Sequence, residues 1–154
     1  MFIKSVRLKK PQLWMLGAAL VLAVLILFAV KLNGGRVSGE SLIMRTEEER
    51  QSFIASMGWE TEPEYSDCRT VTIPEDFGDV YEQYNDLQKQ QGFDLSKYKG
   101  RTAELYTYPV LNYEGHTEKD CMRLTLIVYN GELIGGDVCC TELNGFMQGL
   151  KRGE

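Results

Sequence analysis

The chain has 154 residues, and its formal charge of −5 is the sum of two unlike parts. Residues 1–39 contain 6 of the 17 Lys and Arg and no acid, so residues 40–154 set the other 11 against all 22 acidic residues, a balance of −11. At one domain per roughly 100–200 residues, this length fits one globular domain and an accessory segment. A multidomain enzyme, a repeat array and a basic nucleic-acid-binding protein are therefore not expected.

The N-terminal part contains an apolar run typical of a membrane segment. Residues 13–30, LWMLGAALVLAVLILFAV, form 18 residues without a charge, close to the roughly 20 that cross a hydrocarbon core. Four basic residues precede the run and two follow it, which favours a cytoplasmic N-terminus. A cleaved signal peptide is the alternative, but no A-x-A-like site follows the run directly.

The chain is therefore predicted to be a single-pass protein of the cell membrane with its C-terminal domain outside the cytoplasm. A basic cytoplasmic tail is expected over residues 1–12 and a transmembrane helix over residues 13–31. A flexible linker rich in Gly and Ser is expected over residues 32–44, followed by an extracytoplasmic domain over residues 45–150.

Two helices are predicted in this domain, each with its own start signal. The sequence T-E-E-E at 46–49 is a capping box, and Gly58 is a typical stop, so the first helix is expected over residues 47–57. Pro74 and the acids after it suit the start of the second helix. Its apolar positions recur at helical spacing over residues 77–91.

The strands are predicted from alternation and from turn residues. Asn130-Gly131 is the strongest short hairpin signal in the chain. After the strand that follows this turn, a short helix or turn is expected over residues 141–150. The predicted fold class is therefore α+β: an N-terminal transmembrane helix followed by a small antiparallel sheet backed by two helices. The expected strands cover residues 59–62, 69–73, 102–110, 121–129 and 132–139.

Four cysteines lie in the acidic domain, where disulfides are chemically possible: Cys68, Cys121, Cys139 and Cys140. With a two-residue loop at 130–131, residues 121 and 140 face each other at about 5.5 Å between Cα atoms, within disulfide range. A bulge at Gly135-Gly136 would bring Cys139 opposite Cys121 instead. One bridge from Cys121 to Cys139 or Cys140 is expected, with Cys68 bound to the remaining partner, and four unpaired thiols are the alternative.

Catalytic motifs are few. His116 is the only histidine and has no partner at metal-ligand spacing, so no metal site and no cofactor are expected. Ser96 and Lys99 match S-x-x-K, but the other elements of that chemistry are absent from the sequence. Gly135, Gly136 and Asp137 are weak candidates for ligand binding, because two glycines beside an acid allow close approach of a ligand or a backbone.

Several blocks of the sequence resemble the bacterial domain-of-unknown-function family numbered forty-eight thirty, over about residues 45–150. Its members are short proteins of Gram-positive bacteria with one N-terminal membrane segment. The resemblance implies no activity, cofactor or catalytic residue. The distinctive blocks are V-T-I-P-E-D-F-G-D-V-Y-E-Q-Y-N-D-L-Q-K-Q-Q-G at 71–92 and L-I-V-Y-N-G-E-L-I-G-G-D-V at 126–138.

The function predicted from these observations is binding, as a protein-interaction module held at the membrane, rather than catalysis. The balance of −11 excludes nucleic acid as a partner and favours a neutral or cationic protein. The alternative is a hydrolase-like enzyme of the cell envelope that uses Ser96 with Lys99, or Asp137.

Overall fold

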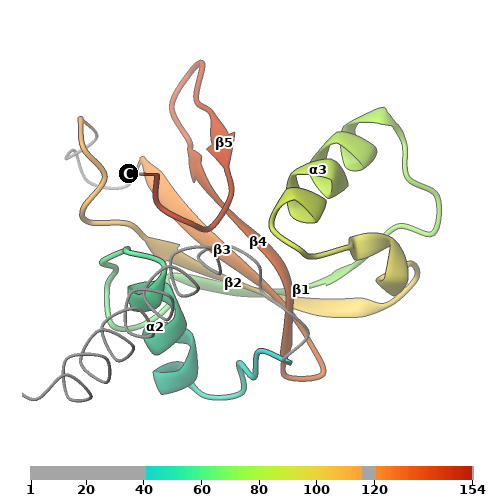
Figure 1. The fold of residues 1–154 in the computed structure, drawn as a ribbon, viewed down its shortest axis with the longest axis horizontal. Coiled ribbons are helices and arrows are strands. Elements are labelled where there is room, and N and C mark those ends of the chain that lie inside the picture. The colour runs from blue at the N-terminus through green and yellow to red at the C-terminus, as the bar shows by residue number, and fades with distance from the viewer. Residues whose placement is uncertain (1–40, 116–120, 154) are drawn as a thin grey trace, which may run out of the picture. The chain divides into compact units, whose positions relative to one another are not determined.

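The computed structural model describes residues 41–115 and 121–153, which form one five-stranded antiparallel sheet with helices on both faces (Figure 1). The strands lie in the order in which they occur in the chain, β1-β2-β3-β4-β5. The elements are α2 (Glu47–Ser56), β1 (Asp67–Thr72), α3 (Asp79–Gln90), the 3-10 helix η1 (Leu95–Tyr98), β2 (Thr102–Pro109), β3 (Met122–Tyr129), β4 (Glu132–Cys140) and β5 (Met147–Gln148).

The predicted fold class is corrected at the N-terminal part of the chain. Residues 13–31 lie outside the described residues, as do the predicted tail and most of the predicted linker. Within residues 41–115 and 121–153, no helix is long and apolar enough to cross a membrane. The longer of the two α-helices has 12 residues, about 18 Å of helix, against a hydrocarbon core of about 30 Å.

The first face of the sheet packs against α2 and forms the larger core. The capping box predicted at the start of α2 is present, because the Thr46 hydroxyl accepts from the Glu49 N–H and the Glu49 side chain accepts from the Thr46 N–H. Alternate residues of β3 point into this core together with Phe53 and Ile54 of α2. The β3 residues are Met122, Leu124, Leu126 and Val128.

A buried arginine attaches α2 to the sheet. Arg50 is 5% exposed, and its guanidinium donates to the Tyr108 hydroxyl at 3.0 Å and to the Met44 carbonyl at 3.0 Å. It also pairs with Glu47 at 2.9 Å and lies 4.0 Å from the centre of the Tyr106 ring. Burial of the charge is therefore offset by hydrogen bonds, an ion pair and a cation–π contact.

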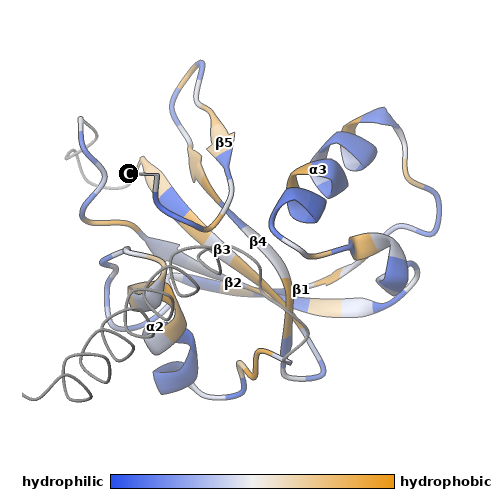
Figure 2. Cartoon of the chain, viewed as in Figure 1, coloured by the Kyte–Doolittle hydropathy of each residue, from blue (hydrophilic) through white to orange (hydrophobic). Residues whose placement is uncertain are grey.

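The second face of the sheet packs against α3 and η1 around a smaller core, formed by Ile73, Leu95, Ala103, Ile127 and Ile134. Most of α3 is hydrophilic (Figure 2), and its two buried residues are Asn85 and Gln88. The side-chain oxygen Oδ1 of Asn85 accepts from the Leu95 N–H at 2.8 Å. Polar contacts therefore carry much of the packing of this helix.

Two contacts join the C-terminal end of α3, at Gln88 and the following Gln91, to a glycine of β4. The Gln88 Oε1 accepts from the Gly136 N–H at 2.8 Å, and the Gln91 Nε2 donates to the Gly136 carbonyl at 3.0 Å. A Cβ at position 136 would collide with the main-chain oxygen of Thr125 and would meet Leu150 at 3.0 Å. Only glycine lets the strand lie this close to its neighbours.

The C-terminal segment passes the edge of the sheet and binds elements of both faces. The Leu150 N–H donates at 2.6 Å to Gln91, the residue that follows α3, while the Leu150 carbonyl accepts from the Trp59 indole at 2.6 Å. The Arg152 N–H donates to the Met57 carbonyl at the end of α2 at 3.1 Å. Residues 150–152 therefore join the two helices.

The β3–β4 hairpin is confirmed, but its register differs from the expected one. Asn130 and Gly131 have φ values of 51° and 80°, as a two-residue primed turn requires. A bulge is present beside Gly135, where Ile127 pairs with Gly135 and Val128 with Leu133. The extra residue lies in β4, so Cys140 pairs with Met122 rather than with Cys121.

Two segments differ from the predicted elements. Residues 59–62, predicted as a strand, contribute one isolated bridge between Thr61 and Val110. Residues 141–150, predicted as a helix or turn, form a hairpin that ends in β5. Asn144 has a φ of 65°, and a Cβ on Gly145 would collide with the Cys140 carbonyl. The turn therefore requires residues with the main-chain freedom of Asn and Gly at these two positions.

We expect Gly136→Ala to lower the free energy of unfolding by about 1–3 kcal/mol, the usual cost of overpacking. Gly153→Ala is the matched control, because a Cβ there would meet nothing within 4 Å. Urea unfolding of the full-length variants measures both. Equal stability of the two variants would contradict the role assigned to Gly136.

Candidate functional site

Two of the weak candidate residues for ligand binding are covered in the structure. Gly135 and Gly136 are buried, and a Cβ on Gly135 would meet the Gln88 Oε1 at 2.9 Å. The space that the two glycines leave open for a ligand or a backbone is therefore filled by α3. The third candidate, Asp137, is 4% exposed and lies at the edge of the surface that α3 covers.

Asp137 forms a small polar cluster with a tyrosine and a cysteine. The Tyr84 hydroxyl donates to the Asp137 Oδ1 at 2.8 Å, and the Cys139 thiol is hydrogen-bonded to the same carboxyl. Burial raises the pKa of Asp137, against the effect of these hydrogen bonds. Burial, followed by the charge of Asp137, raises the pKa of Tyr84 and raises that of Cys139 to about 11.

These shifts work against nucleophilic chemistry at the cluster. A catalytic cysteine needs a lowered pKa, because the thiolate is the nucleophile. Cys139 has the opposite shift and stays protonated at neutral pH. The cluster therefore serves to hold α3 on the sheet, with Asp137 as the acceptor of both hydrogen bonds.

Ser96 and Lys99 have structural partners of their own. The Ser96 hydroxyl donates to the Asp94 Oδ1 at 2.6 Å, at the start of η1. The Lys99 ammonium lies 4.5 Å from the centre of the Phe77 ring. Asp137 binds Tyr84 instead, so the structure does not join these three candidates in one constellation. His116 lies outside the described residues.

The cysteines lie in two regions of the sheet, Cys68 on β1 and the other three around the end of β4 and the start of β3. All four lie within the described residues, and none takes part in a disulfide in the structure. Cys121 and Cys140 are buried in the first core, with a hydrogen bond between their thiols. Cys68 lies on β1, three strands from β4, about 14 Å away and beyond the reach of a bridge to Cys139 or Cys140.

A hollow of about 480 Å³ lies at the opposite end of the domain from η1. We call it the Trp59 pocket, and its lining residues are Trp59, Tyr113, Glu114, Gln148, Arg152 and Gly153. The Trp59 and Tyr113 rings are stacked with their centres 5.6 Å apart. The Tyr113 hydroxyl donates to the Gln148 Oε1 at 3.1 Å.

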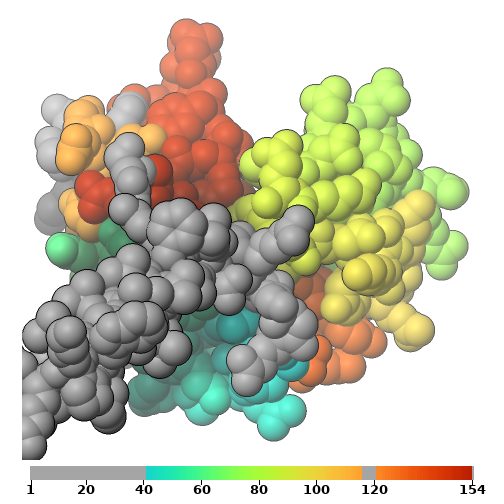
Figure 3. Space-filling model, in the orientation of Figure 1, coloured from blue at the N-terminus to red at the C-terminus, as the bar shows by residue number. Residues whose placement is uncertain are grey.

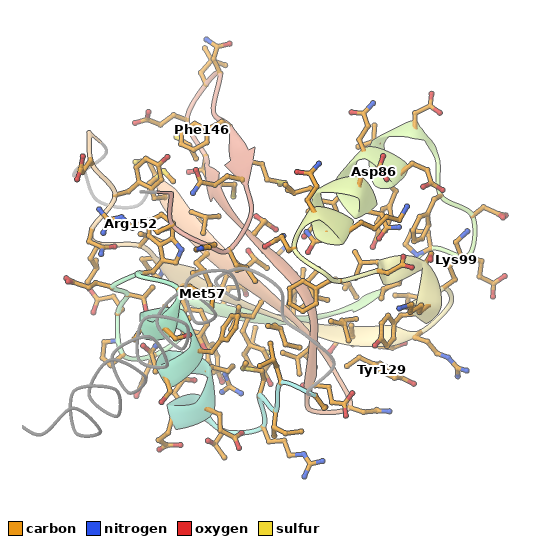
Figure 4. The ribbon with its side chains drawn as sticks, viewed as in Figure 1. Met57, Asp86, Lys99, Tyr129, Phe146 and Arg152 are labelled. Carbon is orange, nitrogen blue, oxygen red and sulfur yellow. The ribbon has the colours of Figure 1, made fainter. Side chains whose placement is uncertain are left out.

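Arg152 gives this pocket a cation. Its guanidinium lies 5.5 Å from the centre of the Trp59 ring, and it pairs with Glu114 at 3.7 Å. The Glu114 side chain is 95% exposed, so this ion pair is weak. In Figure 4, Arg152 and Phe146 lie on one side of the domain and Lys99 on the other.

An apolar surface adjoins the pocket. We call Leu143, Phe146 and Met147 the hairpin surface, because they belong to the β4–β5 hairpin, which stands out from the domain apart from α3 (Figure 3). They are 94%, 39% and 51% exposed. Phe146 packs against Tyr113 with ring centres 5.6 Å apart, so the hairpin surface and the pocket are continuous.

Sequence reasoning missed both features. The pocket draws its residues from segments that are far apart in the sequence, and no local pattern brings them together. Leu143, Phe146 and Met147 recur at i, i+3 and i+4, the spacing of one helix face, so their spacing favoured a helix over an exposed hairpin. The signal that could have located the hairpin is the Asn144-Gly145 pair, which is typical of a turn.

The family model described as "Domain of unknown function (DUF4830)" matches residues 53–138. The chain belongs to this family. The matched residues include α3, Gly136 and Asp137, so the contact between α3 and β4 lies within the family domain. They end before the β4–β5 hairpin. No curated protein and no solved structure matches the chain.

The raised pKa of Asp137 predicts a dependence of stability on pH. Between the unfolded pKa, about 3.9, and the higher folded pKa, the native state binds more protons than the unfolded state, so stability falls as pH rises. Asp137→Asn removes this loss and keeps an acceptor for Tyr84. We expect the variant to gain stability relative to the unmodified protein as pH rises from about 4 through the raised folded pKa of Asp137, measured by urea unfolding.

Asp94→Asn is a control of opposite sign. The hydrogen bond from Ser96 lowers the pKa of Asp94 most strongly, with Asn85 contributing. Ionised Asp94 therefore stabilises the fold above its unfolded pKa, and this contribution is lost as pH falls. The Asp94→Asn variant should lose stability relative to the unmodified protein as pH rises. The same trend in both variants would contradict the assignment.

The bridge predicted between Cys121 and Cys140 stays a prediction, and the contact between their thiols gives it a definite geometry. In purified protein oxidised by glutathione disulfide, we expect peptide mapping to recover Cys121 linked to Cys140. Cys139 should be alkylated without prior reduction, because it lies on the other face with Asp137. Alkylation of all four thiols without prior reduction would refute the bridge.

Proposed function

We propose that the domain binds a protein partner through the hairpin surface and the adjoining Trp59 pocket. The observation that carries this proposal is the continuity of the two, made by the packing of Phe146 against Tyr113. An exposed apolar patch beside a concave site is a common form of protein interface. The proposed interface combines the projecting hairpin surface with the concave Trp59 pocket.

The composition of this surface supports the proposal. The centres of protein interfaces are enriched in Trp, Tyr, Phe, Met and Arg, and all five types occur here. The three residues of the hairpin surface fall within five positions of the chain. Exposure of Leu143 to water costs free energy that burial against a partner recovers.

Charge narrows the class of partner. The balance of −11 over residues 40–154 repels nucleic acid and anionic surfaces at long range. Arg152 gives the pocket itself a positive group beside the carboxylate of Glu114. The proposed partner is therefore a neutral or basic protein that presents an apolar side chain to the hairpin and a polar group to the pocket.

Binding is proposed rather than catalysis because the catalytic candidates are engaged elsewhere. The Ser96 hydroxyl donates to Asp94, which caps η1, the Lys99 ammonium lies over the Phe77 ring, and Cys139 has a raised pKa. The Trp59 pocket contains an arginine, a glutamate and an amide without a nucleophile beside a base. The location of the domain outside the cytoplasm stays a prediction from the sequence.

The proposal predicts a position-dependent crosslink in cells that express the full-length protein. A photoreactive phenylalanine at position 143 should yield a covalent adduct with one protein species after irradiation. The matched control is position 80, where Val80 is 82% exposed on α3. We expect at least a fivefold weaker adduct from position 80, since it lies on the other face of the sheet.

Substitution within the pocket tests the same surface independently. Arg152→Ala should weaken the adduct formed from position 143 by roughly tenfold, as expected for an arginine at the centre of an interface. Equal adducts from positions 143 and 80, or an adduct unaffected by Arg152→Ala, would contradict the proposal. Circular dichroism of each variant verifies that the fold is retained.

A further inference from the structure

One edge of the sheet is open in the part of the chain that the structure describes. At the β4 edge, β5 pairs with one half of the strand, and the segment before α2 binds the other half. There the Leu133 N–H donates to the Leu42 carbonyl at 2.9 Å, and the Met44 N–H donates to the Gly131 carbonyl at 2.8 Å. At the opposite edge, β1 pairs with β2 alone, and an open edge is a template for another strand.

The main-chain groups that face outward from β1 follow from its pairing. The Ile73 N–H donates to the Arg101 carbonyl at 2.8 Å, toward β2. Because hydrogen-bonding direction alternates along an antiparallel strand, the odd-numbered residues of β1 bond to β2. The N–H and carbonyl groups of Cys68, Thr70 and Thr72 therefore point away from the sheet, and these three residues are exposed.

The charges on β1 are arranged around Cys68. Asp67 and Arg69 flank it, and their side chains form an ion pair of 2.7 Å on one face of the strand, with 45% and 66% of the side chains exposed. Each charge is thus available to a second strand. Cys68 itself is exposed.

These charges are self-complementary in one register. When two copies of a strand pair around a two-fold axis, residue i faces residue j and residue j faces residue i. With the axis at Cys68, each Asp67 faces Arg69 of the second copy. An axis at Arg69 or at Asp67 places like charges opposite each other, which is destabilising. An axis at Thr70 leaves both charges opposite uncharged residues.

We propose that β1 pairs antiparallel with β1 of a second copy of this chain, with the two-fold axis at Cys68. Two reciprocal ion pairs join Asp67 of each copy to Arg69 of the other. The outward N–H and carbonyl groups of the two Cys68 residues bond to each other, which makes one continuous ten-stranded sheet. This dimer uses the edge opposite to β5 and does not depend on the hairpin surface.

A charge exchange tests the ion pairs. The association of the full-length protein is measured by light scattering in a non-ionic detergent, which keeps the apolar run of residues 13–30 in solution. Asp67→Arg turns both pairs into like-charge pairs and should weaken association by roughly tenfold or more. The double variant Asp67→Arg with Arg69→Asp exchanges the charges and should restore association to within about threefold of the unmodified protein.

Disulfide trapping tests the register. The two Cα atoms of a hydrogen-bonded pair lie about 5.5 Å apart, within disulfide range. Diamide oxidises two thiols to a disulfide by accepting their two hydrogens, and it should link the two Cys68 residues into a covalent dimer that a reductant cleaves. Cys68→Ser should abolish the covalent dimer and leave the association measured by light scattering within about threefold.

Three results would overturn the proposal. The first is a monomer at all accessible concentrations. The second is association that Asp67→Arg leaves unchanged, or that the exchanged variant does not restore. The third is trapping through Thr70→Cys, introduced into Cys68→Ser, without trapping at Cys68 itself, because that result places the axis where the charges do not pair.

Discussion

Two amide side chains at the C-terminal end of helix α3 bond to the main chain of one glycine of the sheet, beside the apolar contacts of the smaller core. Gln88 and Gln91 engage the N–H and the carbonyl of Gly136, where ordinary helix packing would use apolar contacts. This arrangement requires that position 136 carry no side chain, because the carbonyl of Thr125 lies against it. The two blocks of sequence that first suggested the family, one in α3 and one in β4, are thus the two sides of a single contact. Their joint presence in the family domain follows from geometry and needs no ligand.

The same contact explains why the second face of the sheet carries buried polar groups. Asp137 lies one residue beyond Gly136 and must be buried once α3 is in place. Tyr84 and Cys139 then supply the hydrogen bonds that a buried carboxyl needs. On the first face the buried charge of Arg50 likewise has partners, because it pairs with Glu47 and lies over the ring of Tyr106. In both places an ionisable side chain is buried where a helix attaches to the sheet.

Local signals predicted most of the elements of the domain and few of its long-range contacts. The capping box at Thr46, the hairpin at Asn130-Gly131 and the alternation of β3 each depend on residues close in sequence, and each is confirmed. The predicted register of the hairpin was wrong, because β4 contains one added residue. Alternation alone does not show in which strand such a residue lies or in which direction it moves the pairing. β5 was missed because the turn before it depends on the fit of Gly145 against the carbonyl of Cys140. The Trp59 pocket combines separate segments of the chain, so only the folded chain defines it.

Leu150 gives the domain an order of assembly. Its carbonyl accepts from the indole of Trp59, which belongs to the core of the first face, and its N–H donates to Gln91, which follows α3 on the second face. During synthesis both α-helices and the strands of the sheet emerge before this residue does. Neither core has its full set of contacts until then. Leu150 is a buried member of the larger core, and it also bonds to Gln91 at the end of the helix that covers the smaller core. A nascent chain that stops short of residue 150 therefore contains α2 and α3 but lacks the residue that bonds to Trp59 and Gln91.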